Sequence, residues 1–515
     1  MRVSVAAYDR GVETSGRTAV DIRRRHPVQI NYASAIAIGV AFAGFIGLLL
    51  WLPNPVSGAD GGNWLALSLG FVGVHANAAS TVYPPGFHLL LLAAQLVLPP
   101  LEALRVTGAA VSVLPGLGSY WLLRELRCGR LAFAGLGVAL SGFSLEMLAW
   151  GGYPQLMGIG LAIAAEAALL VGLRAGSRSR LAIAGVLSAL TVLTHHVVAL
   201  QAVIWLGTTA LIAIAAAGPA LPARARHVLL FAGVSAAASI PAVPTYITLL
   251  THAGTSAFNA NGFDLTGVLQ YLTNDGPVLW LTLAAFVPLA IALRVWERAW
   301  SDVGVLVGLA VASIGLMLLT DELRTAYLTQ PLAIASTAIV FSRLLDKALR
   351  VPRFLLAAVA SLLFLTVAWA GLQRLDRSVR FYAVLDPSVV EGLEWLSHHR
   401  EANDLAVVSE GRGKWPLGWW VEGISHVPSY MDYDPRWLYF SEEKKQAAIA
   451  TAILATDDPQ LAAAQARAHA ISLIVIDTRD FGRADTWLRS GRVVGDIGLI
   501  YTNPSLVVFR VAHSS

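Results

Sequence analysis

Long apolar stretches separated by short polar turns occupy most of the chain from residue 30 to about residue 373. A helix that crosses the hydrocarbon core of a bilayer needs about 20 mostly apolar residues, so we expect most of these stretches to be membrane spans. They number eleven by this criterion: 30–52, 101–123, 131–149, 154–173, 180–194, 197–217, 228–249, 276–293, 302–319, 326–342 and 353–373. A further stretch, 86–98, is short and lies between Pro84-Pro85 and Pro99-Pro100, which predicts an interfacial or re-entrant helix.

Composition makes the bilayer the only reasonable solvent. Hydrophobic residues are 56% of the chain and charged residues 14%. A soluble protein of this composition would expose a large apolar surface to water, at a high cost in free energy. The net charge of +4 is carried by basic residues at the ends of the apolar stretches, which indicates topology and not nucleic-acid binding. An intramolecular disulfide is excluded because Cys128 is the only cysteine.

Most basic residues before the tail fall on one side if the N-terminus is inside and the spans number eleven. The outer side then keeps only Arg105 and Arg324. Counting 86–98 as a full span would move Arg124, Arg127 and Arg130 outside, so the eleven-span topology is favoured. The first stretch is too long for the core of a cleaved signal peptide, which predicts a retained anchor.

The pattern changes after the last apolar stretch. Strand-like stretches occur at 405–409, 471–477, 497–502 and 506–511, and two helical segments, near 441–456 and 458–470, lie between them. We therefore expect a polytopic α-helical membrane protein with a C-terminal extracytoplasmic α/β domain. The predicted division is a cytoplasmic N-terminal tail (1–29), a membrane domain (30–373, with a first outer loop at 53–100) and a soluble domain (374–515).

The first outer loop has a single acid, Asp60, between Gly58 and Gly61-Gly62. Glycines allow the backbone and a substrate to approach closely, and a carboxylate there suits a general base or a metal ligand. The alternative is an aspartate that caps a helix starting near Asn63. The loop ends in Tyr83-Pro84-Pro85-Gly86, followed by His88.

Other outer-face polar residues could complete a site with Asp60. Glu146 would be the second acid of a two-carboxylate site, and Tyr83, Tyr153, Gln155 and His195 are candidate acceptor or sugar contacts. Since adjacent helical residues point about 100° apart, we expect at most one of His195 and His196 to face the site.

The two outer arginines suit a phosphate, because the guanidinium binds it with two parallel hydrogen bonds. Each also has a local acid as an alternative partner: Glu102 for Arg105, and Asp321 or Glu322 for Arg324.

In this order along the chain, the motifs resemble those of the GT-C superfamily of membrane glycosyltransferases, which use polyprenyl- or dolichyl-phosphate-linked sugars. Asp60 stands where the family has its first-loop catalytic aspartate, Tyr83–His88 resembles the Pro-Pro start of the surface helix, and Glu146 matches the second-loop acid. Arg324, Tyr327 and Pro331 resemble the pattern that opens a late span and binds lipid phosphate, with Arg105 and His88 as further candidates.

The sequence departs from this family in two places. The first loop has no Asp-x-Asp pair, so the divalent cation (Mg or Mn) that Asp60 and Glu146 would share stays an open question. Trp419-Trp420-Val421-Glu422-Gly423 lacks the Asp and Tyr of the Trp-Trp-Asp-Tyr-Gly motif of oligosaccharyltransferases, so Trp419 and Glu422 are only candidate acceptor contacts.

The resemblance implies a glycosyltransferase in the plasma membrane of a prokaryote, with its active site on the extracytoplasmic face. The donor would be a polyprenyl-phosphate-linked sugar, the acceptor a glycan, lipid or protein, and nucleic acid no partner. Two other functions stay open. A secondary transporter predicts an internal repeat and mid-membrane ionisable residues, and neither is apparent in the sequence. A non-catalytic scaffold with a partner-binding outer domain would leave Asp60 and Arg324 unexplained.

Overall fold

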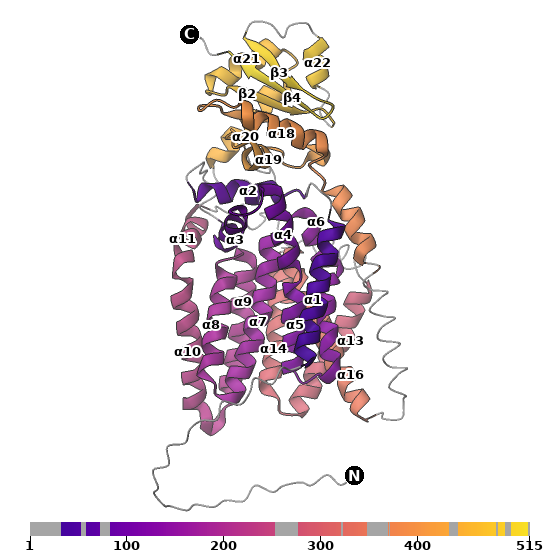
Figure 1. The fold of residues 1–515 in the computed structure, drawn as a ribbon. Coiled ribbons are helices and arrows are strands. Elements are labelled where there is room, and N and C mark those ends of the chain that lie inside the picture. The colour runs from indigo at the N-terminus through magenta and orange to yellow at the C-terminus, as the bar shows by residue number, and fades with distance from the viewer. Residues whose placement is uncertain are drawn as a thin grey trace, which may run out of the picture.

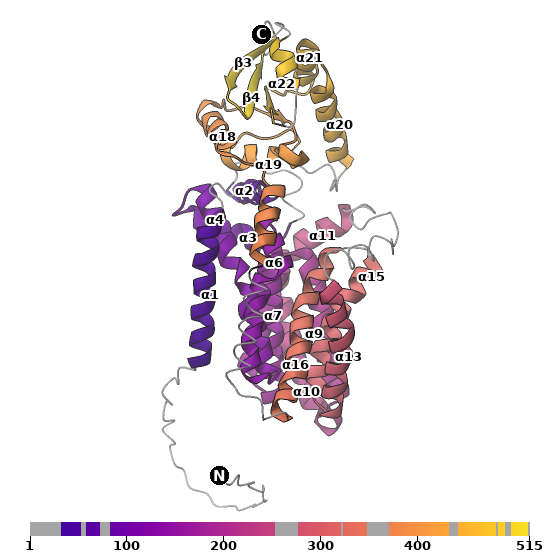
Figure 2. The ribbon, with the colours of Figure 1, turned by 90° about the vertical axis from the view of Figure 1, so that its right-hand side faces the viewer.

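The computed structural model has two parts, a bundle of long helices and a smaller α/β unit stacked on one end of it (Figure 1). The structure describes residues 32–52, 58–72, 83–252, 277–320, 323–347, 369, 371–431, 441–479, 483–489 and 496–512. The short helices α2 (Gly61–Gly70) and α3 (Gly86–Gln95) lie between the bundle and the α/β unit (Figures 1 and 2). The first predicted outer loop therefore lies on the same side as the C-terminal part.

Nine stretches within the described residues are long and apolar enough to cross a membrane. They are α1 (Tyr32–Trp51); α4 (Pro100–Ser112) with α5 (Leu114–Glu125); η2 (Gly129–Leu140) with α6 (Gly142–Trp150); α7 (Tyr153–Ala175); α9 (His196–Ala215); η3 (Gly218–Ala220), α10 (Leu221–Ser239), η4 (Ile240–Ala242) and α11 (Val243–His252); α13 (Pro277–Trp296); α14 (Trp300–Ala310), η5 (Val311–Gly315) and α15 (Leu316–Thr320); and η6 (Leu323–Leu328) with α16 (Thr329–Lys347). A polytopic helical membrane protein is confirmed by these stretches.

Two of the eleven predicted spans are not among the nine. The stretch 180–194 forms α8 (Arg178–Val192), which packs between α7 and α10 but has only 15 residues. The stretch 353–373 lies almost entirely outside the described residues. The apolar stretch 86–98 forms α3, whose 10 residues extend only about 15 Å, half of the hydrocarbon thickness.

The predicted span 131–149 is not one α-helix. Its first part, η2, is a 12-residue 3₁₀ helix, and α6 begins only at Gly142. Runs of 3₁₀ helix this long are uncommon, because the hydrogen bonds of a 3₁₀ helix are poorer than those of an α-helix. Close packing accompanies the change, since a Cβ on Gly135 would clash with the backbone nitrogen of Tyr120 in α5.

One mid-membrane acid escaped the sequence analysis. Glu166 lies well inside α7 and is fully buried at the level of Thr209 on α9. The interpretation that the sequence contains no mid-membrane ionisable residue was therefore wrong. Glu166 was overlooked because a single acid barely changes the mean hydropathy of a 23-residue apolar helix.

Charged residues also gather where α7, α13 and α14 meet. Asp302, at the start of α14, is ion-paired with Arg174 and with the buried Arg294, whose Nε lies 3.3 Å from the Asp302 carboxylate. Glu297 joins the cluster through Arg294 (2.7 Å) and Arg343 (2.6 Å). These ion pairs therefore connect Arg174, Arg294 and Arg343, which the predicted topology assigns to three different loops on the inner side of the membrane.

The α/β unit (residues 387–512) contains a four-stranded sheet of order β1-β2-β4-β3. Its strands are β1 (Ala406–Val408), β2 (Leu473–Asp477), β3 (Ile497–Thr502) and β4 (Leu506–Val511), close to the four predicted segments. The first two strands are parallel, and β4 pairs antiparallel with both β2 and β3.

The two helices expected from the sequence are present as α20 (Ser441–Ala455) and α21 (Pro459–Ala468). The elements α18 (Pro387–His399), α19 (Gly418–Trp420), η8 (Val421–Ser425) and α22 (Arg483–Arg489) were not predicted. Three of these are too short for periodicity to be visible, and their conformation depends on packing.

The α/β unit contacts the first loop through glycines. A Cβ on Gly62 of α2 would lie 2.7 Å from the Trp420 nitrogen, and a Cβ on Gly61 would lie equally close to the Trp420 ring. Gly423 approaches Leu65 and the Gly62 carbonyl in the same way. Gly61 and Gly62, expected to allow close approach of a substrate, instead allow close packing of Trp420, which is fully buried.

Candidate active site

Asp60 lies in a tight turn that is fixed to the end of α6. Its backbone N–H donates to the Trp150 carbonyl at 2.9 Å, and the Trp64 indole donates to the Gly151 carbonyl. Gly58 and Gly151 make this close approach possible: a Cβ on Gly58 would lie 2.8 Å from the Ala149 carbonyl, and Gly151 has a φ of +93°. The glycine-rich sequence thus brings the first loop to the end of α6.

The side chain of Asp60 does not cap a helix. Asp60 precedes the first residue of α2, but its carboxylate accepts no capping hydrogen bond, and its backbone is helical (φ −92°, ψ −2°) instead of extended. The residue is half-buried. Helix capping, the alternative role considered for Asp60, is therefore not what holds this carboxylate in place.

Glu146 lies on α6 close to this turn. Its carboxylate accepts a hydrogen bond from Arg374 at 2.8 Å and one from the Tyr382 hydroxyl at 3.5 Å. Both partners come from the segment that connects the helical bundle to the α/β unit. Gly142 leaves room for the arginine, because a Cβ there would lie 3.3 Å from Arg374 Cδ.

Tyr382 lies close enough to both carboxylates, Glu146 and Asp60, to interact with their charges. Burial, together with the charges of the nearby Glu146 and Asp60 carboxylates, raises the pKa of its phenol to about 12, while Arg374 acts in the opposite direction. The hydroxyl therefore stays protonated and donates to Glu146. Neither Tyr382 nor Arg374 was predicted, because they lie more than 200 residues from Glu146 in the chain.

Arg324 lies at the start of η6 and is half-buried. It interacts electrostatically with Tyr327 and with His195 of the neighbouring helix α9. Tyr327 in turn interacts electrostatically with Glu146 and accepts a hydrogen bond from the Trp150 indole. Its ring packs 5.2 Å from that of Phe143. Tyr327 therefore connects the arginine to Glu146.

Two buried amides hold the backbone that carries Arg324. Gln155 of α7 donates to the Arg324 carbonyl at 3.3 Å, and Gln201 of α9 donates to the carbonyls of Thr325 (2.9 Å) and Ala312 (3.0 Å). Both amides are fully buried. Gln155, expected as an acceptor or sugar contact, is thus occupied in supporting η6.

An aromatic wall, formed by Trp64, Tyr83, His88, His195 and His196, lies beside Arg324. The Tyr83 ring is 4.9 Å from Trp64, 5.5 Å from His88 and His196, and 5.9 Å from His195. Burial lowers the pKa of His88 to about 4, which makes its ring neutral at pH 7. The wall is joined to the bundle where the Gly86 N–H donates to the Leu193 carbonyl at 2.6 Å.

The two adjacent histidines do not diverge as expected. Their rings stack 5.0 Å apart at 9°, because His195 is the extended N-cap of α9 and not part of the helix. The 100° rule applies only inside a helix. His195 Nδ1 also accepts a hydrogen bond from the Val198 N–H at 3.4 Å, so this side chain caps the start of α9.

The other candidates have contacts away from the carboxylates. Arg105 donates to the Leu49 carbonyl and pairs with Glu102 at 3.4 Å, its local alternative. Glu422 is buried and accepts from the Ser429 N–H at 2.9 Å. Tyr153 is fully buried against Phe87 and Gly108. Trp419 is half-buried, and its backbone contacts α2.

The divalent cation that Asp60 and Glu146 were expected to share does not fit these contacts well. Mg²⁺ and Mn²⁺ prefer about six oxygen ligands, and Mg²⁺ usually takes one or two of them from protein carboxylates and the rest from water and substrate phosphate. The described residues include no group of three or more His, Cys, Asp or Glu that could hold a metal. Glu146 is moreover paired with a cation of the protein, Arg374.

The similarity of this chain to known proteins lies in its three-dimensional structure. Neither a family model nor a curated protein matches the sequence. The oligosaccharyltransferase AglB of Archaeoglobus fulgidus, solved in complex with an inhibitory peptide and a dolichol-phosphate, superimposes with a TM-score of 0.57 at 15% identity. The match covers 87% of this chain and 69% of AglB.

The chain shares the fold of AglB. A second structure of the same enzyme, solved with Zn and sulfate, gives a TM-score of 0.56 at 16% identity over 86% of this chain and 68% of AglB. The expected resemblance to GT-C membrane glycosyltransferases is confirmed at the level of the fold. The identity is too low for residues to be transferred from one protein to the other, so the roles of side chains rest on the contacts above.

Proposed function

We propose that this protein is a membrane glycosyltransferase that moves a sugar from a polyprenyl-phosphate-linked donor to an extracytoplasmic acceptor. The observation that supports it best is the convergence of Asp60, Glu146 and Arg324 at one end of the bundle, linked through Tyr327 and Tyr382. These residues come from four separate segments, and the fold is that of an enzyme solved with dolichol-phosphate.

Arg324 is the proposed donor-phosphate ligand. It is half-buried, and its backbone is fixed by Gln155 and Gln201. A guanidinium in this setting can bind phosphate with two parallel hydrogen bonds and needs little reorganisation to do so. Tyr327 and His88 are proposed secondary contacts, and the aromatic wall offers ring faces for the sugar. We keep Arg105 out of this role because of its pairing with Glu102.

Asp60 is the proposed general base. The oxygen of the acceptor hydroxyl forms a bond to the anomeric carbon while the bond from that carbon to the phosphate oxygen breaks. The acceptor proton passes to the Asp60 carboxylate, and the lipid phosphate leaves with the bonding electrons, its charge balanced by Arg324. One displacement of this kind inverts the anomeric centre. Glu146 would orient the acceptor hydroxyl.

The proposed topology places this chemistry outside the cytoplasm. Eleven spans with the N-terminus inside would leave Asp60, Arg324 and the α/β unit on the outer face of a prokaryotic plasma membrane. A glycan, lipid or protein acceptor would then reach Asp60 beside the Trp419–Gly423 segment, which packs on α2.

The test uses purified full-length protein in nanodiscs with a panel of polyprenyl-phosphate sugars and extracted acceptor glycans, peptides and lipids. Asp60→Asn preserves the shape of the side chain, so donor binding should be unchanged while turnover falls about 10²–10⁴-fold. Asp496→Asn, at a surface ion pair with Arg467, is the matched control and should be as active as the wild type. Normal turnover of Asp60→Asn would exclude Asp60 as the base, and the absence of sugar transfer from every donor would contradict the proposal as a whole.

A further inference from the structure

The segment that joins the bundle to the α/β unit contributes directly to the candidate active site. It consists of helical residues 371–381 followed by residues 382–386, here called the connecting segment. Figure 2 shows this helix rising along the bundle into the α/β unit. Two of its side chains, Arg374 and Tyr382, contact Glu146.

The lower half of the connecting segment is held against the membrane domain by close packing. A Cβ on Gly371 would lie 2.5 Å from the Leu140 carbonyl, at the junction of η2 and α6. Leu375, one turn further on, is fully buried. Arg374 is therefore carried past Gly142 and reaches Glu146 from a helix in a fixed position.

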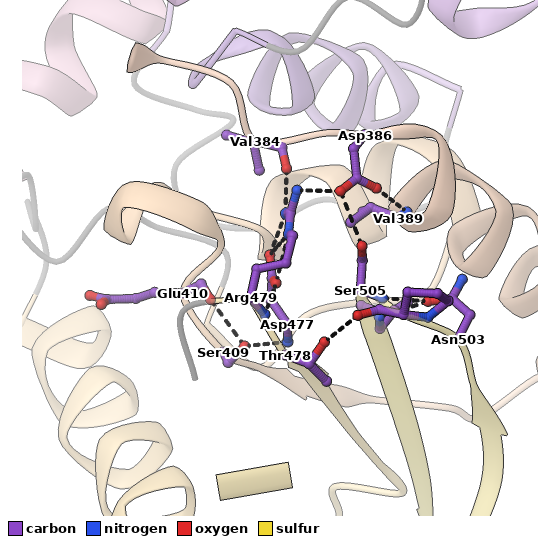
Figure 3. Close-up of polar contacts among 12 residues, drawn as sticks. Val384, Asp386, Val389, Ser409, Glu410, Asp477, Thr478, Arg479, Asn503 and Ser505 are labelled. Carbon is purple, nitrogen blue, oxygen red and sulfur yellow. Dashed lines mark hydrogen bonds and ion pairs between the residues drawn. The ribbon is translucent and has the colours of Figure 1, made fainter. Parts of the chain in front are cut away.

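The upper half is held by the α/β unit at two points. Trp415 donates its indole N–H to the Phe381 carbonyl at 2.9 Å and packs its ring 5.1 Å from that of Tyr382. Figure 3 shows the second point, where Arg479, just after β2, donates to the Val384 carbonyl (2.6 Å) and to the Asp386 carboxylate (2.9 Å).

Arg479 is itself fixed by the sheet. Its guanidinium is paired with the buried Asp477 at the end of β2, and the Asp477 N–H donates to Ser409, which follows β1. Asp386 also accepts hydrogen bonds from Ser505 and from the Val389 N–H at the start of α18. Residues 384–386 are thus hydrogen-bonded to side chains anchored in the sheet, in contrast to an ordinary interdomain linker, which few contacts cross.

We propose that Tyr382 and Arg374 are positioning residues that orient the Glu146 carboxylate, and that Trp415 and Arg479 transmit the placement of the α/β unit to this carboxylate. The proposal rests on the proposed function and deepens it. The hydroxyl of Tyr382 fixes one oxygen of Glu146 and Arg374 the other, so the carboxylate has a single orientation toward the Asp60 turn. An acceptor that displaced the α/β unit would thereby change the alignment of the acid that orients its own hydroxyl.

The experiment measures kcat and KM for the full-length enzyme. Tyr382→Phe keeps the ring on Trp415 and removes only the hydroxyl, so kcat should fall about tenfold with the donor KM unchanged. Tyr430→Phe, which removes a hydroxyl next to His469 in the α/β unit, is the matched control and should leave kcat unchanged.

A double-mutant cycle separates positioning from general damage. If Tyr382 acts through Glu146, Tyr382→Phe should have little effect on kcat in a Glu146→Gln background, and the two changes should be non-additive. Trp415→Phe keeps a ring but loses the donor to Phe381 and should reproduce the loss in kcat, whereas Trp395→Phe, on α18, should not.

The results have clear consequences. Unchanged kcat in Tyr382→Phe, or additive losses in the cycle, would overturn the inference even if Asp60→Asn is inactive. If Asp60→Asn is fully active instead, the proposed function fails first. Arg374→Lys provides a further check, because a lysine can restore the charge beside Glu146 and should recover part of the activity lost in Arg374→Met.

Discussion

The contact between Gly62 and the α/β unit allows a quantitative prediction. Gly62→Ala adds one methyl group to α2. In an exposed helix this change would stabilise the helix by about 1 kcal/mol, because glycine has the poorer helix propensity. At this position the new Cβ would lie 2.7 Å from the Trp420 nitrogen and 2.8 Å from the Trp419 carbonyl carbon.

Both of these neighbours are backbone atoms, so no side-chain rotation can relieve the clash. Overpacking of this kind costs about 1–3 kcal/mol. Because several contacts lie below 3.0 Å at once, we expect the upper half of this range. After subtraction of the propensity gain, the docking of the α/β unit on α2 should weaken by about 1–2 kcal/mol, a factor of about 5–30 in the ratio of docked to undocked protein.

Hydrogen exchange of the amides of residues 418–425, measured in nanodiscs, reports this docking directly. Exchange of these amides should accelerate in Gly62→Ala, and sugar transfer should fall with it. Gly207→Ala is the matched control, since Gly207 also lies in a helix but has nothing within 4 Å of its Cβ position. Equal exchange at residues 418–425 in both variants would refute the packing argument.

Three further predictions can be checked independently. Arg324→Lys should raise the donor KM about 10- to 100-fold, because one charge-assisted hydrogen bond is worth about 1.5–3 kcal/mol, while unchanged donor binding in Arg324→Ala would make this residue an ion-pair partner only. In a Cys128→Ser background, an impermeant thiol reagent applied from outside should label cysteines at positions 60 and 255 and spare one at 127; external labelling at 127 would refute the eleven-span topology. Thermal stability should decrease as the pH falls from 6.5 to about 4, because unfolded protein protonates His88 in this range and folded protein does not. His88→Phe should show a smaller decrease, and identical pH curves would contradict the buried neutral state of this ring.

The sequence alone was sufficient for the class of the protein and for most of its elements. Apolar length, not side-chain detail, makes a membrane span, so the stretches could be counted without a structure. Short runs rich in β-branched and aromatic residues likewise located β3 and β4 at their observed bounds. The order of Asp60, Glu146 and Arg324 along the chain also suggested the GT-C fold that the structural comparison confirmed.

Local sequence could not show which of these side chains meet. Glu146 depends on Arg374 and Tyr382, whose positions are set by glycine contacts and by the α/β unit, more than 200 residues away along the chain. His195 and His196 stack because His195 lies outside the helix, and Gln155 supports η6 instead of facing the aromatic wall. Glu166 is buried without any trace in the apolar pattern. Composition and periodicity show whether a segment faces lipid, water or the protein interior. Which side chains contact one another depends on how segments distant in the chain pack together, and only the tertiary structure shows this.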